Sequence, residues 1–436
     1  MRRFLFLIVA AGMGALPARA QQADSAAATT LQVTLDEALR RALDVQPAII
    51  QAQGAQRNAG ASQRAAFGAF LPSLSLTGGS AHASGNRFNS ATNQIVSGPA
   101  STSYTGGISL NLTLFDGFAR FASSSAAAAS ADAADAGYTN QRFQVTLATK
   151  QVFYNALATD ELVLVAEAQV RQAQQQMDIA IQKLHAGSAT RSDSLRSLVD
   201  LGNAKLALLQ AQANQLTAQA NLGRQIGVDR PVSAVPDSAL APYPDTAALR
   251  VDAIARAPQV AQAEAQAHAA QSQVTVARAQ YFPSFTAGYS NGYAGFDAPW
   301  TSTTSYVNNW TLRFSVSLPI FNGFTREQQL VAADVQRDVA VAQAADTRRL
   351  VGAQLTQQIA ALQAAYTQID IATTNVAATT EDLRVQQERY RVGASTILDL
   401  LTSEANLTTA KTNLVQARFN YNIARAQLEA LVGRTL

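Results

Sequence analysis

The chain has 436 residues, of which 48% are hydrophobic and 14% charged, and it contains no cysteine. Its 33 basic and 30 acidic residues give a formal net charge of +3, but Arg2, Arg3 and Arg19 lie in the first twenty positions. The remainder of the chain is therefore neutral, which argues against a nucleic-acid partner. The lack of cysteine excludes disulfides, thiol chemistry and thiolate metal sites.

Residues 1–20 predict a secretory signal peptide. Arg2 and Arg3 form its charged start, residues 4–11 its apolar core, and Ala18-Arg19-Ala20 an A-x-A cleavage site. No later stretch reaches the roughly 18 consecutive apolar residues that a membrane-spanning helix needs. The mature protein is therefore expected to leave the cytoplasm, and any membrane-spanning part must consist of β-strands.

The first half of the mature chain, residues 21–227, begins with short helices that lead into strands. Thr34 and Glu37 form a capping box that begins one helix, and Pro47 begins a second. Strands are expected at about 70–84 and 104–115. The residues between them, 85–103, are rich in Gly, Asn and Ser and predict an exposed loop.

A long helical hairpin follows these strands. Residues 118–186 contain no proline and only one glycine, so they predict a helix about 100 Å long. Gly187 ends this helix, and a return helix is expected from about Thr190 to Ile226.

The second half, residues 245–436, repeats the first after a proline-rich linker at 228–244. Pro258 and Pro283 follow Pro47 and Pro72 by 211 positions. Later landmarks recur 206 positions apart: Phe115 and Phe321, Gly187 and Gly393, Asp193 and Asp399, Gly227 and Gly433. This constant spacing predicts an internal duplication. Strands are therefore expected at about 282–294 and 308–321, and a second helical hairpin with its tip near 393.

Apolar and polar residues alternate clearly in the last of these strands. Trp310, Leu312, Phe314, Val316 and Leu318 face one way, and Thr311, Arg313, Ser315 and Ser317 the other. This pattern is typical of a lipid-embedded barrel wall, and the alternative is a strand of a soluble sandwich. Aromatic residues that suit the two membrane interfaces are Tyr104, Tyr281, Phe282, Tyr289, Tyr293 and Trp300.

Four strands per chain are too few to close a membrane barrel. A barrel needs about eight or more strands, and an open edge cannot face lipid, so several copies must combine. Two chains would give eight strands and three would give twelve, and the strand count does not choose between them. The helices carry long heptad seams, such as Leu355-Ile359-Leu362-Tyr366, which predict packing of helix against helix.

The two strand-to-helix junctions have nearly the same sequence. Leu110–Arg120 contains Phe-Asp-Gly-Phe around Gly117, and Val316–Arg326 contains Phe-Asn-Gly-Phe around Gly323. With the proline-led strands, the duplication and the glycine-marked helix tips, the mature chain resembles the TolC family of outer-membrane channels, the outer-membrane factors of tripartite efflux pumps and type I secretion systems.

This resemblance implies a membrane α+β fold in which three chains form a composite antiparallel β-barrel of twelve strands, continued by a long α-helical coiled-coil barrel. It implies a passive exit duct in the outer membrane of a Gram-negative bacterium, with a large periplasmic portion. It implies that the chain assembles as a homotrimer. The implied partners are a periplasmic adaptor (membrane fusion protein), an inner-membrane RND or ABC-type transporter and outer-membrane lipid, and no nucleic acid is expected.

The candidate functional residues lie at the two helix tips. Gly187 and Gly393 suit helix ends, Thr190 and Thr396 suit N-caps, and Asp193 and Asp399 follow three residues later, so capping alone explains these residue types. In a trimer the two acids would also form rings that favour cations. The resemblance assigns Asp193, Asp399 and Tyr390 to a closed periplasmic gate. It assigns the tip residues to the adaptor contact, namely Gly187, Ser188, Thr190, Gly393, Ala394, Ser395 and Thr396.

Two positions depart from the family pattern at the second tip. Ser395 stands where some relatives have an arginine, and Thr402 where some have a further acid, so the gate is expected to be held differently or more loosely.

No motif predicts an enzyme, a cofactor or a metal site. His82, His185 and His268 have neither ligand nor triad spacing and are expected to be surface or packing residues. One rival interpretation is a periplasmic coiled-coil scaffold or adaptor that never enters a membrane, and another is a free-standing porin. The sequence leaves the transported substrate, the pump and the pore diameter open.

Overall fold

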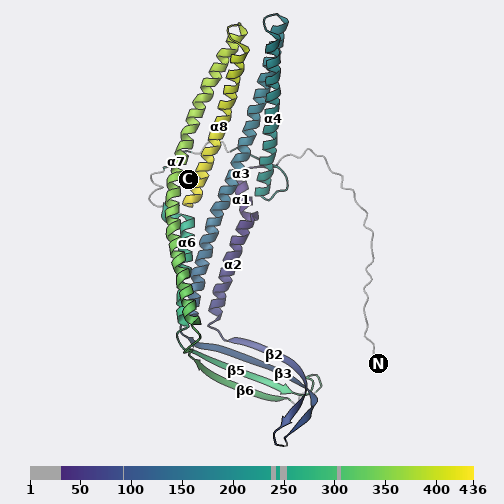
Figure 1. The fold of residues 1–436 in the computed structure, drawn as a ribbon, viewed down its shortest axis with the longest axis vertical. Coiled ribbons are helices and arrows are strands. Elements are labelled where there is room, and N and C mark those ends of the chain that lie inside the picture. The colour runs from purple at the N-terminus through teal and green to yellow at the C-terminus, as the bar shows by residue number, and fades with distance from the viewer. Residues whose placement is uncertain (1–30, 92, 237–241, 246–252, 302–305) are drawn as a thin grey trace, which may run out of the picture.

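The computed structural model describes residues 31–91, 93–236, 242–245, 253–301 and 306–436. The expected signal peptide at 1–20 lies outside these residues, as does part of the expected linker at 228–244. The described chain is elongated, with a four-stranded sheet at one end of a long helical bundle and two helical tips at the other (Figure 1).

Two helices of equal length run through the bundle. The helices α3 (Ala119–His185) and α7 (Thr325–Arg391) each have 67 residues, which corresponds to about 100 Å. Each turns back into a shorter helix, α4 (Arg191–Gln225) after α3 and α8 (Ile397–Val432) after α7. Because α3 also packs against α8, the two hairpins lie side by side in the order α7, α8, α3, α4.

Three shorter helices complete the half of the bundle nearest the sheet. They are α1 (Leu35–Val45), α2 (Pro47–Gly68) and α6 (Pro258–Ala279). The hydroxyl oxygen of Thr34 accepts a hydrogen bond from the Glu37 amide at the start of α1, which is one of the two bonds of the predicted capping box. The Glu37 carboxylate pairs instead with Arg40 and Arg41. Pro47 and Pro258 each occupy the first turn of a helix, where the missing N–H group would have no partner.

The bundle is held by small side chains and a buried ionic cluster. Alanines such as Ala126, Ala156 and Ala180 are almost completely buried along α3 and allow close helix approach. The carboxylate of Glu429 on α8 pairs with Lys150 on α3 and lies 3.4 Å from the Nε atom of Arg425. This pairing ties the two hairpins together near the C-terminus and satisfies charges that are otherwise buried.

The sheet at the end of the bundle is antiparallel, with strand order β2-β3-β5-β6. Its strands are β2 (Ser73–Asn89), β3 (Gln94–Asp116), β5 (Ser284–Gly295) and β6 (Val307–Ser317). In one chain β2 and β6 are the two edges, and each has a strand on only one side (Figure 1).

The expectation of an exposed loop at 85–103 was wrong. After a register shift between Ala83 and Gly85, pairing continues as far as Asn89 with Gln94. Backbone hydrogen bonds need no apolar side chains, so Gly, Asn and Ser residues extend this hairpin well beyond its apolar part. At the other end, β6 stops at Ser317 and not near 321, since Pro319 has no N–H to donate.

The strand register places mainly apolar residues on one face of the sheet and polar residues on the other. One row across the four strands contains Leu74, Leu110, Tyr289 and Leu312, and the row beside it on the same face contains Leu76, Ile108, Asn291 and Trp310. Leu76 is 80% exposed and Trp310 67% exposed in the single chain. Among the described residues, none of the helices combines the length and hydropathy needed to cross a bilayer.

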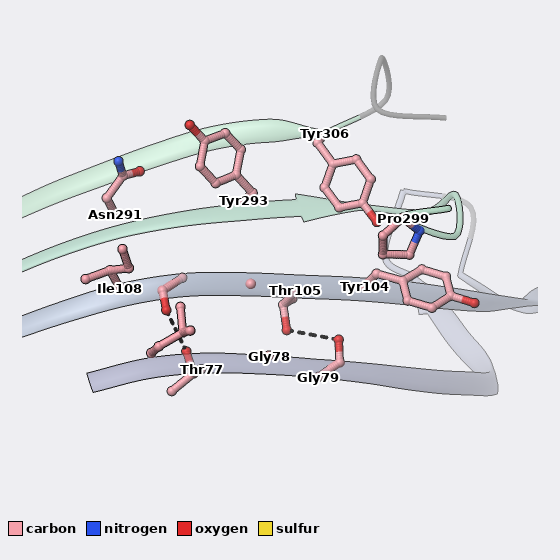
Figure 2. A pocket seen from close by; sticks show the side chains of 13 residues that line it. Thr77, Gly78, Gly79, Tyr104, Thr105, Ile108, Asn291, Tyr293, Pro299 and Tyr306 are labelled. Carbon is pink, nitrogen blue, oxygen red and sulfur yellow. Dashed lines mark hydrogen bonds between the residues drawn. The ribbon is translucent and has the colours of Figure 1, made fainter. Parts of the chain in front are cut away.

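A hollow of about 520 Å³ lies on the apolar face towards the end of the sheet that is far from the helices (Figure 2). Gly78 and Gly106 are paired there and leave space, while Tyr104, Tyr293 and Tyr306 surround it. Aromatic rings therefore gather where β5 and β6 end and the four-stranded part of the sheet gives way to the β2–β3 hairpin.

A small parallel sheet pairs the start of the described chain with the expected linker. The strand β1 (Leu31–Val33) pairs with β4 (Val232–Ala234), and Val33, Val232 and Ala234 are buried against α3 and α4. The proline-rich segment is thus partly a structural element, which the sequence pattern did not predict, because a three-residue strand has too few positions to show a period.

Candidate functional site

The first helix tip is shaped by a glycine in the left-handed conformation. α3 ends at His185, and Gly187 has φ +72°. The Ser188 amide donates to the Lys183 carbonyl oxygen at 2.9 Å, and the Gly187 amide donates to that of Leu184 at 3.0 Å. These bonds satisfy carbonyl groups that a helix end leaves free.

The second tip has the same construction. α7 ends at Arg391, Gly393 has φ +80°, and the Ala394 amide donates to the Arg389 carbonyl oxygen at 2.8 Å. The Arg389 guanidinium in turn donates to the Ala394 carbonyl oxygen at 3.3 Å. Both tips are thus compact turns whose backbone groups are bonded within the turn.

A complete capping box begins each return helix. At the first tip, the Asp193 amide donates to the Thr190 hydroxyl oxygen, and the Thr190 amide donates to the Asp193 carboxylate at 2.9 Å. At the second tip, Thr396 and Asp399 make the same pair of bonds, with the amide-to-carboxylate distance at 3.1 Å. Capping therefore accounts for the positions of both acids.

The same hydrogen bonds keep both carboxylates ionised. Donation from the Thr190 amide, and then from its hydroxyl, lowers the pKa of Asp193. Donation from the Thr396 hydroxyl, and then from its amide, lowers the pKa of Asp399. Each tip therefore carries one ionised carboxylate at neutral pH. No hydrogen bond in the described part of the chain joins Asp193 to Asp399.

Tyr390 connects the second tip to the first. Its side chain is 7% exposed and packs with Leu383, Ile397 and Leu400. The Lys183 ammonium lies 3.8 Å from the centre of its ring and also donates a hydrogen bond to its carbonyl oxygen. Within the described residues, the Tyr390 hydroxyl is buried and has no hydrogen-bond partner. Burial, and then the charge of Asp193, raise the pKa of this hydroxyl.

Sequence reasoning did not single out Lys183, because its partner lies 207 positions away. The one available signal is its place in the repeat, since Lys183 stands 206 positions before Arg389, one of the two basic residues in the last turn of α7. A groove of about 600 Å³ lies between these helix ends. Its lining includes Gln175, Ile179, Lys183, Gln387, Tyr390 and Arg391.

Ser395 and Thr402, the two departures from the family pattern, bond within the second hairpin. The Ser395 hydroxyl donates to Gln386 Oε1 at 2.9 Å and lies 3.2 Å from the Asp399 carboxylate. The Thr402 hydroxyl donates to the Leu398 carbonyl oxygen at 2.8 Å. In the single chain, neither side chain reaches across to the first hairpin.

A buried acid lies deeper between the hairpins, beyond the tips. Glu404 of α8 is 9% exposed, and burial raises its pKa to about 7. The nearby charge of Asp200 on α4 raises this pKa further, whereas the side-chain amides of Gln172 and Gln176 of α3 oppose the rise. Its Oε1 atom has no partner among the described residues. No sequence pattern indicates this site, because Glu404 has no acidic counterpart in the first helical hairpin.

The strand-to-helix turns are the other predicted site. Gly117 has φ +67° and Phe118 +66°, and Gly323 and Phe324 have +67° and +62°. In each turn the second phenylalanine packs edge-on against the one before the turn, Phe115 with Phe118 and Phe321 with Phe324. These ring contacts help to hold a non-glycine residue in a conformation that is otherwise unfavourable.

The arginines that follow the turns pair locally. Arg120 forms an ion pair with Asp116 at 3.0 Å and lies over the Phe70 ring. Arg326 donates to the Pro319 carbonyl oxygen at 2.8 Å and lies over the Tyr281 ring. The described residues contain no group of three or more His, Cys, Asp or Glu side chains placed to hold a metal ion.

Comparison with known proteins decides the family. The sequence pattern of the family described as "Outer membrane efflux protein" matches residues 34–228 and 249–434, which is most of the chain. The chain belongs to the outer membrane efflux protein family. This confirms the resemblance to TolC-like outer-membrane factors.

Individual relatives agree with this assignment. The protein is 28% identical over 427 residues to the pyoverdine export outer membrane protein OpmQ of Pseudomonas aeruginosa, covering 92% of this chain and 83% of OpmQ. It is 27% identical over 318 residues to protein CyaE of Bordetella pertussis, covering 70% of this chain and 65% of CyaE, slightly less than two thirds of that protein. The crystal structure of the Campylobacter jejuni CmeC outer membrane channel matches with a TM-score of 0.78 and 17% identity, covering 92% and 85% of the two chains.

Family membership gives the location and general function of this outer membrane efflux protein. Members are outer-membrane exit channels of pumps and secretion systems, and this protein is an outer-membrane channel with a large periplasmic portion. Family members are channels and not enzymes, and channels of this kind are trimers that work with periplasmic adaptors and inner-membrane transporters.

Proposed function

We propose that three copies of this chain form one continuous passive exit duct. The four-stranded sheets would close into a twelve-stranded barrel, and the helical hairpins would form a tunnel below it. The observation that carries this proposal is the sheet itself, which has one apolar face and two unpaired edges, β2 and β6. An unpaired strand edge cannot face lipid, so β6 of one copy is expected to pair with β2 of the next.

An apolar stripe on α4 supports contact between copies in the helical region. Leu206 is 65% exposed and Leu209 62% exposed, and the stripe repeats at helical spacing. Its members are Leu195, Leu198, Val199, Leu206, Leu209 and Leu216. Because α4 and α7 are the two outer helices of the single chain, a cyclic trimer would pack this stripe against α7 of the neighbouring copy.

The tip residues would then form the periplasmic gate. Three copies each of Asp193 and Asp399 would surround the narrow end of the tunnel and attract cations. Lys183 and Tyr390 would keep the two hairpins of each copy together in the closed state. The tip residues Gly187, Ser188, Thr190, Gly393, Ala394, Ser395 and Thr396 would meet the adaptor, which opens the gate.

The two parts of the family match, 34–228 and 249–434, support the proposed duplication. We keep the division into a signal peptide at 1–20, a first repeat at 21–227, a linker at 228–244 and a second repeat at 245–436. The adaptor would connect the duct to an RND or ABC-type transporter of the inner membrane. OpmQ is named for pyoverdine export, and export of small molecules is the corresponding proposal for this chain.

Extraction behaviour tests insertion into the membrane. Outer membranes that contain the protein are washed with high salt and then solubilised with detergent. The protein should stay in the membrane during the salt wash and be released only by detergent, because its apolar sheet face would contact lipid. Release by salt alone would contradict insertion and favour a periplasmic scaffold.

A further inference from the structure

Arg313 is the one charged residue in its row and the two neighbouring rows on the polar face of the sheet. The next row towards the helices contains Asp116, whose charge is paired with Arg120. The strand register places Arg313 in one row with Ser73, Asn111 and Gly288. The neighbouring rows on the same face contain only serine and threonine: Ser75, Ser109, Ser290 and Thr311 on one side, Thr113, Thr286 and Ser315 on the other. Arg313 is therefore the largest and the one charged side chain of these three rows.

The environment leaves the Arg313 guanidinium unneutralised. In the described part of the chain it makes no ion pair, and its side chain is exposed. Directly opposite on β5 is Gly288, which has no side chain to cover it. A side-chain carbon at Gly288 would lie only 3.1 Å from Asn111 Oδ1. Because Gly288 has no side chain, nothing projects from the sheet between Asn111 and Arg313 in this row.

Closure of the barrel would not neutralise Arg313 either. β6 is an edge strand, and its new neighbour in a trimer would be β2 of the next copy. β2, from Ser73 to Asn89, contains no aspartate and no glutamate. This holds whichever register the two strands adopt.

We propose that three Arg313 side chains form a cationic ring inside the barrel, which concentrates small anions and anionic groups of transported molecules. This inference rests on the proposed trimer. Twelve strands about 4.8 Å apart and tilted by about 40° give a backbone radius of about 12 Å. A guanidinium that reaches more than about 4 Å inward therefore lies within one Debye length, about 8 Å, of the axis at physiological salt.

The position of the ring separates it from the acids at the helix tips. Arg313 lies four residues before the end of β6, about 13 Å from the point where the strand stops. Asp193 and Asp399 lie at the opposite end of helices about 100 Å long. The duct would thus present negative charge at the periplasmic gate and positive charge at the barrel.

Ion selectivity of the purified full-length channel in planar bilayers tests the ring. Arg313→Gln should raise the potassium-to-chloride permeability ratio about two- to fivefold at low salt, and the change should disappear near 1 M salt, where the Debye length is about 3 Å. Arg313→Lys should keep the wild-type ratio. Inorganic tripolyphosphate, added on the barrel side, should block Arg313→Gln more weakly than wild type.

Moving the charge separates electrostatics from side-chain structure. The double variant Arg313→Gln with Thr311→Arg puts the charge two positions away on the same face, so it should restore the wild-type ratio, whereas Thr311→Gln alone should change nothing. An unchanged ratio in Arg313→Gln, in protein that still forms trimeric channels, would overturn the ring and leave the trimer intact. Wild-type protein without a trimeric mass would overturn the trimer, and the ring with it.

Discussion

The Lys183 ammonium lies 3.8 Å from the centre of the Tyr390 ring and donates a hydrogen bond to the Tyr390 carbonyl oxygen. Lys183 lies in the last turn of α3 and Tyr390 in the last turn of α7, so the two residues belong to different helical hairpins. A cation–π contact contributes about 0.5–2 kcal/mol, and a hydrogen bond from a charged donor about 1.5–3 kcal/mol. Together they form a direct link across the two tips, and in the proposed gate this link would break on opening.

Removing this link should make the closed channel leak. Lys183→Met keeps the aliphatic chain but loses the charge, and a loss of about 1.4 kcal/mol or more would raise the open fraction at least about tenfold. Single-channel open probability in planar bilayers measures the effect. Tyr390→Phe is the matched control, since the Tyr390 hydroxyl has no hydrogen-bond partner among the described residues. Equal open probabilities for wild type and Lys183→Met would contradict the link.

The tip acids should control selectivity at the periplasmic end. Asp193→Asn together with Asp399→Asn should lower the potassium-to-chloride permeability ratio several-fold. The pKa of each acid is lowered by its threonine, so the difference in this ratio between wild type and the double variant should stay constant from pH 8 to pH 5 and shrink only below the ordinary pKa of 3.8. Reversal potentials at each pH provide the test, and an unchanged ratio in the double variant would exclude the acid ring.

Glu404 should make the stability of the helical bundle depend on pH. Its pKa is raised from 4.5 to about 7 by burial. Between these values the folded protein keeps a proton that the unfolded chain has lost, so stability falls as pH rises through this window and is constant above it. Glu404→Gln stays neutral and should abolish this fall, with a gain of about 3 kcal/mol at pH 8.

Thermal unfolding midpoints at pH 5, 6, 7 and 8 test the role of Glu404. Glu161→Gln, an exposed glutamate on α3, is the control and should follow the wild-type curve. If Glu404→Gln showed the same pH dependence as wild type, another group would be responsible.

The two strand-to-helix glycines should differ in their tolerance of a side chain. Both have φ +67°, so alanine costs about 1–2 kcal/mol at either site. At Gly117 the new carbon would also lie 2.4 Å from Phe282 Cβ and 2.6 Å from the Ala279 carbonyl oxygen, whereas at Gly323 it would meet nothing within 4 Å. Gly117→Ala should therefore strongly reduce the amount of folded protein in the outer membrane, and Gly323→Ala only slightly. Equal amounts for the two variants would contradict the geometry of these turns.

Local rules explain what could be predicted from the sequence. Gly187 and Gly393 mark helix ends, Thr190 and Thr396 cap helices, and both capping boxes are present, because these features depend on residues within one turn of each other. The alternating pattern of β6 likewise follows from the two-residue period of a strand.

Contacts between distant segments explain what could not be predicted. The position of Lys183 against Tyr390, the burial of Glu404 between hairpins and the pairing of β1 with β4 all depend on how helices pack, which no local pattern records. The polar part of the β2–β3 hairpin was missed for a different reason. Gly, Asn and Ser are typical of loops, yet the neighbouring strand pairs with their backbone groups.

The most direct test of the trimeric duct is the native mass of the mature protein extracted with detergent from outer membranes. We predict a mass of three chains after the detergent contribution is subtracted, since twelve strands close the barrel and the α4 stripe becomes covered. A mass of two chains would indicate an eight-stranded barrel, and a single chain would leave the edges of β2 and β6 unpaired. Either result would contradict the proposed duct.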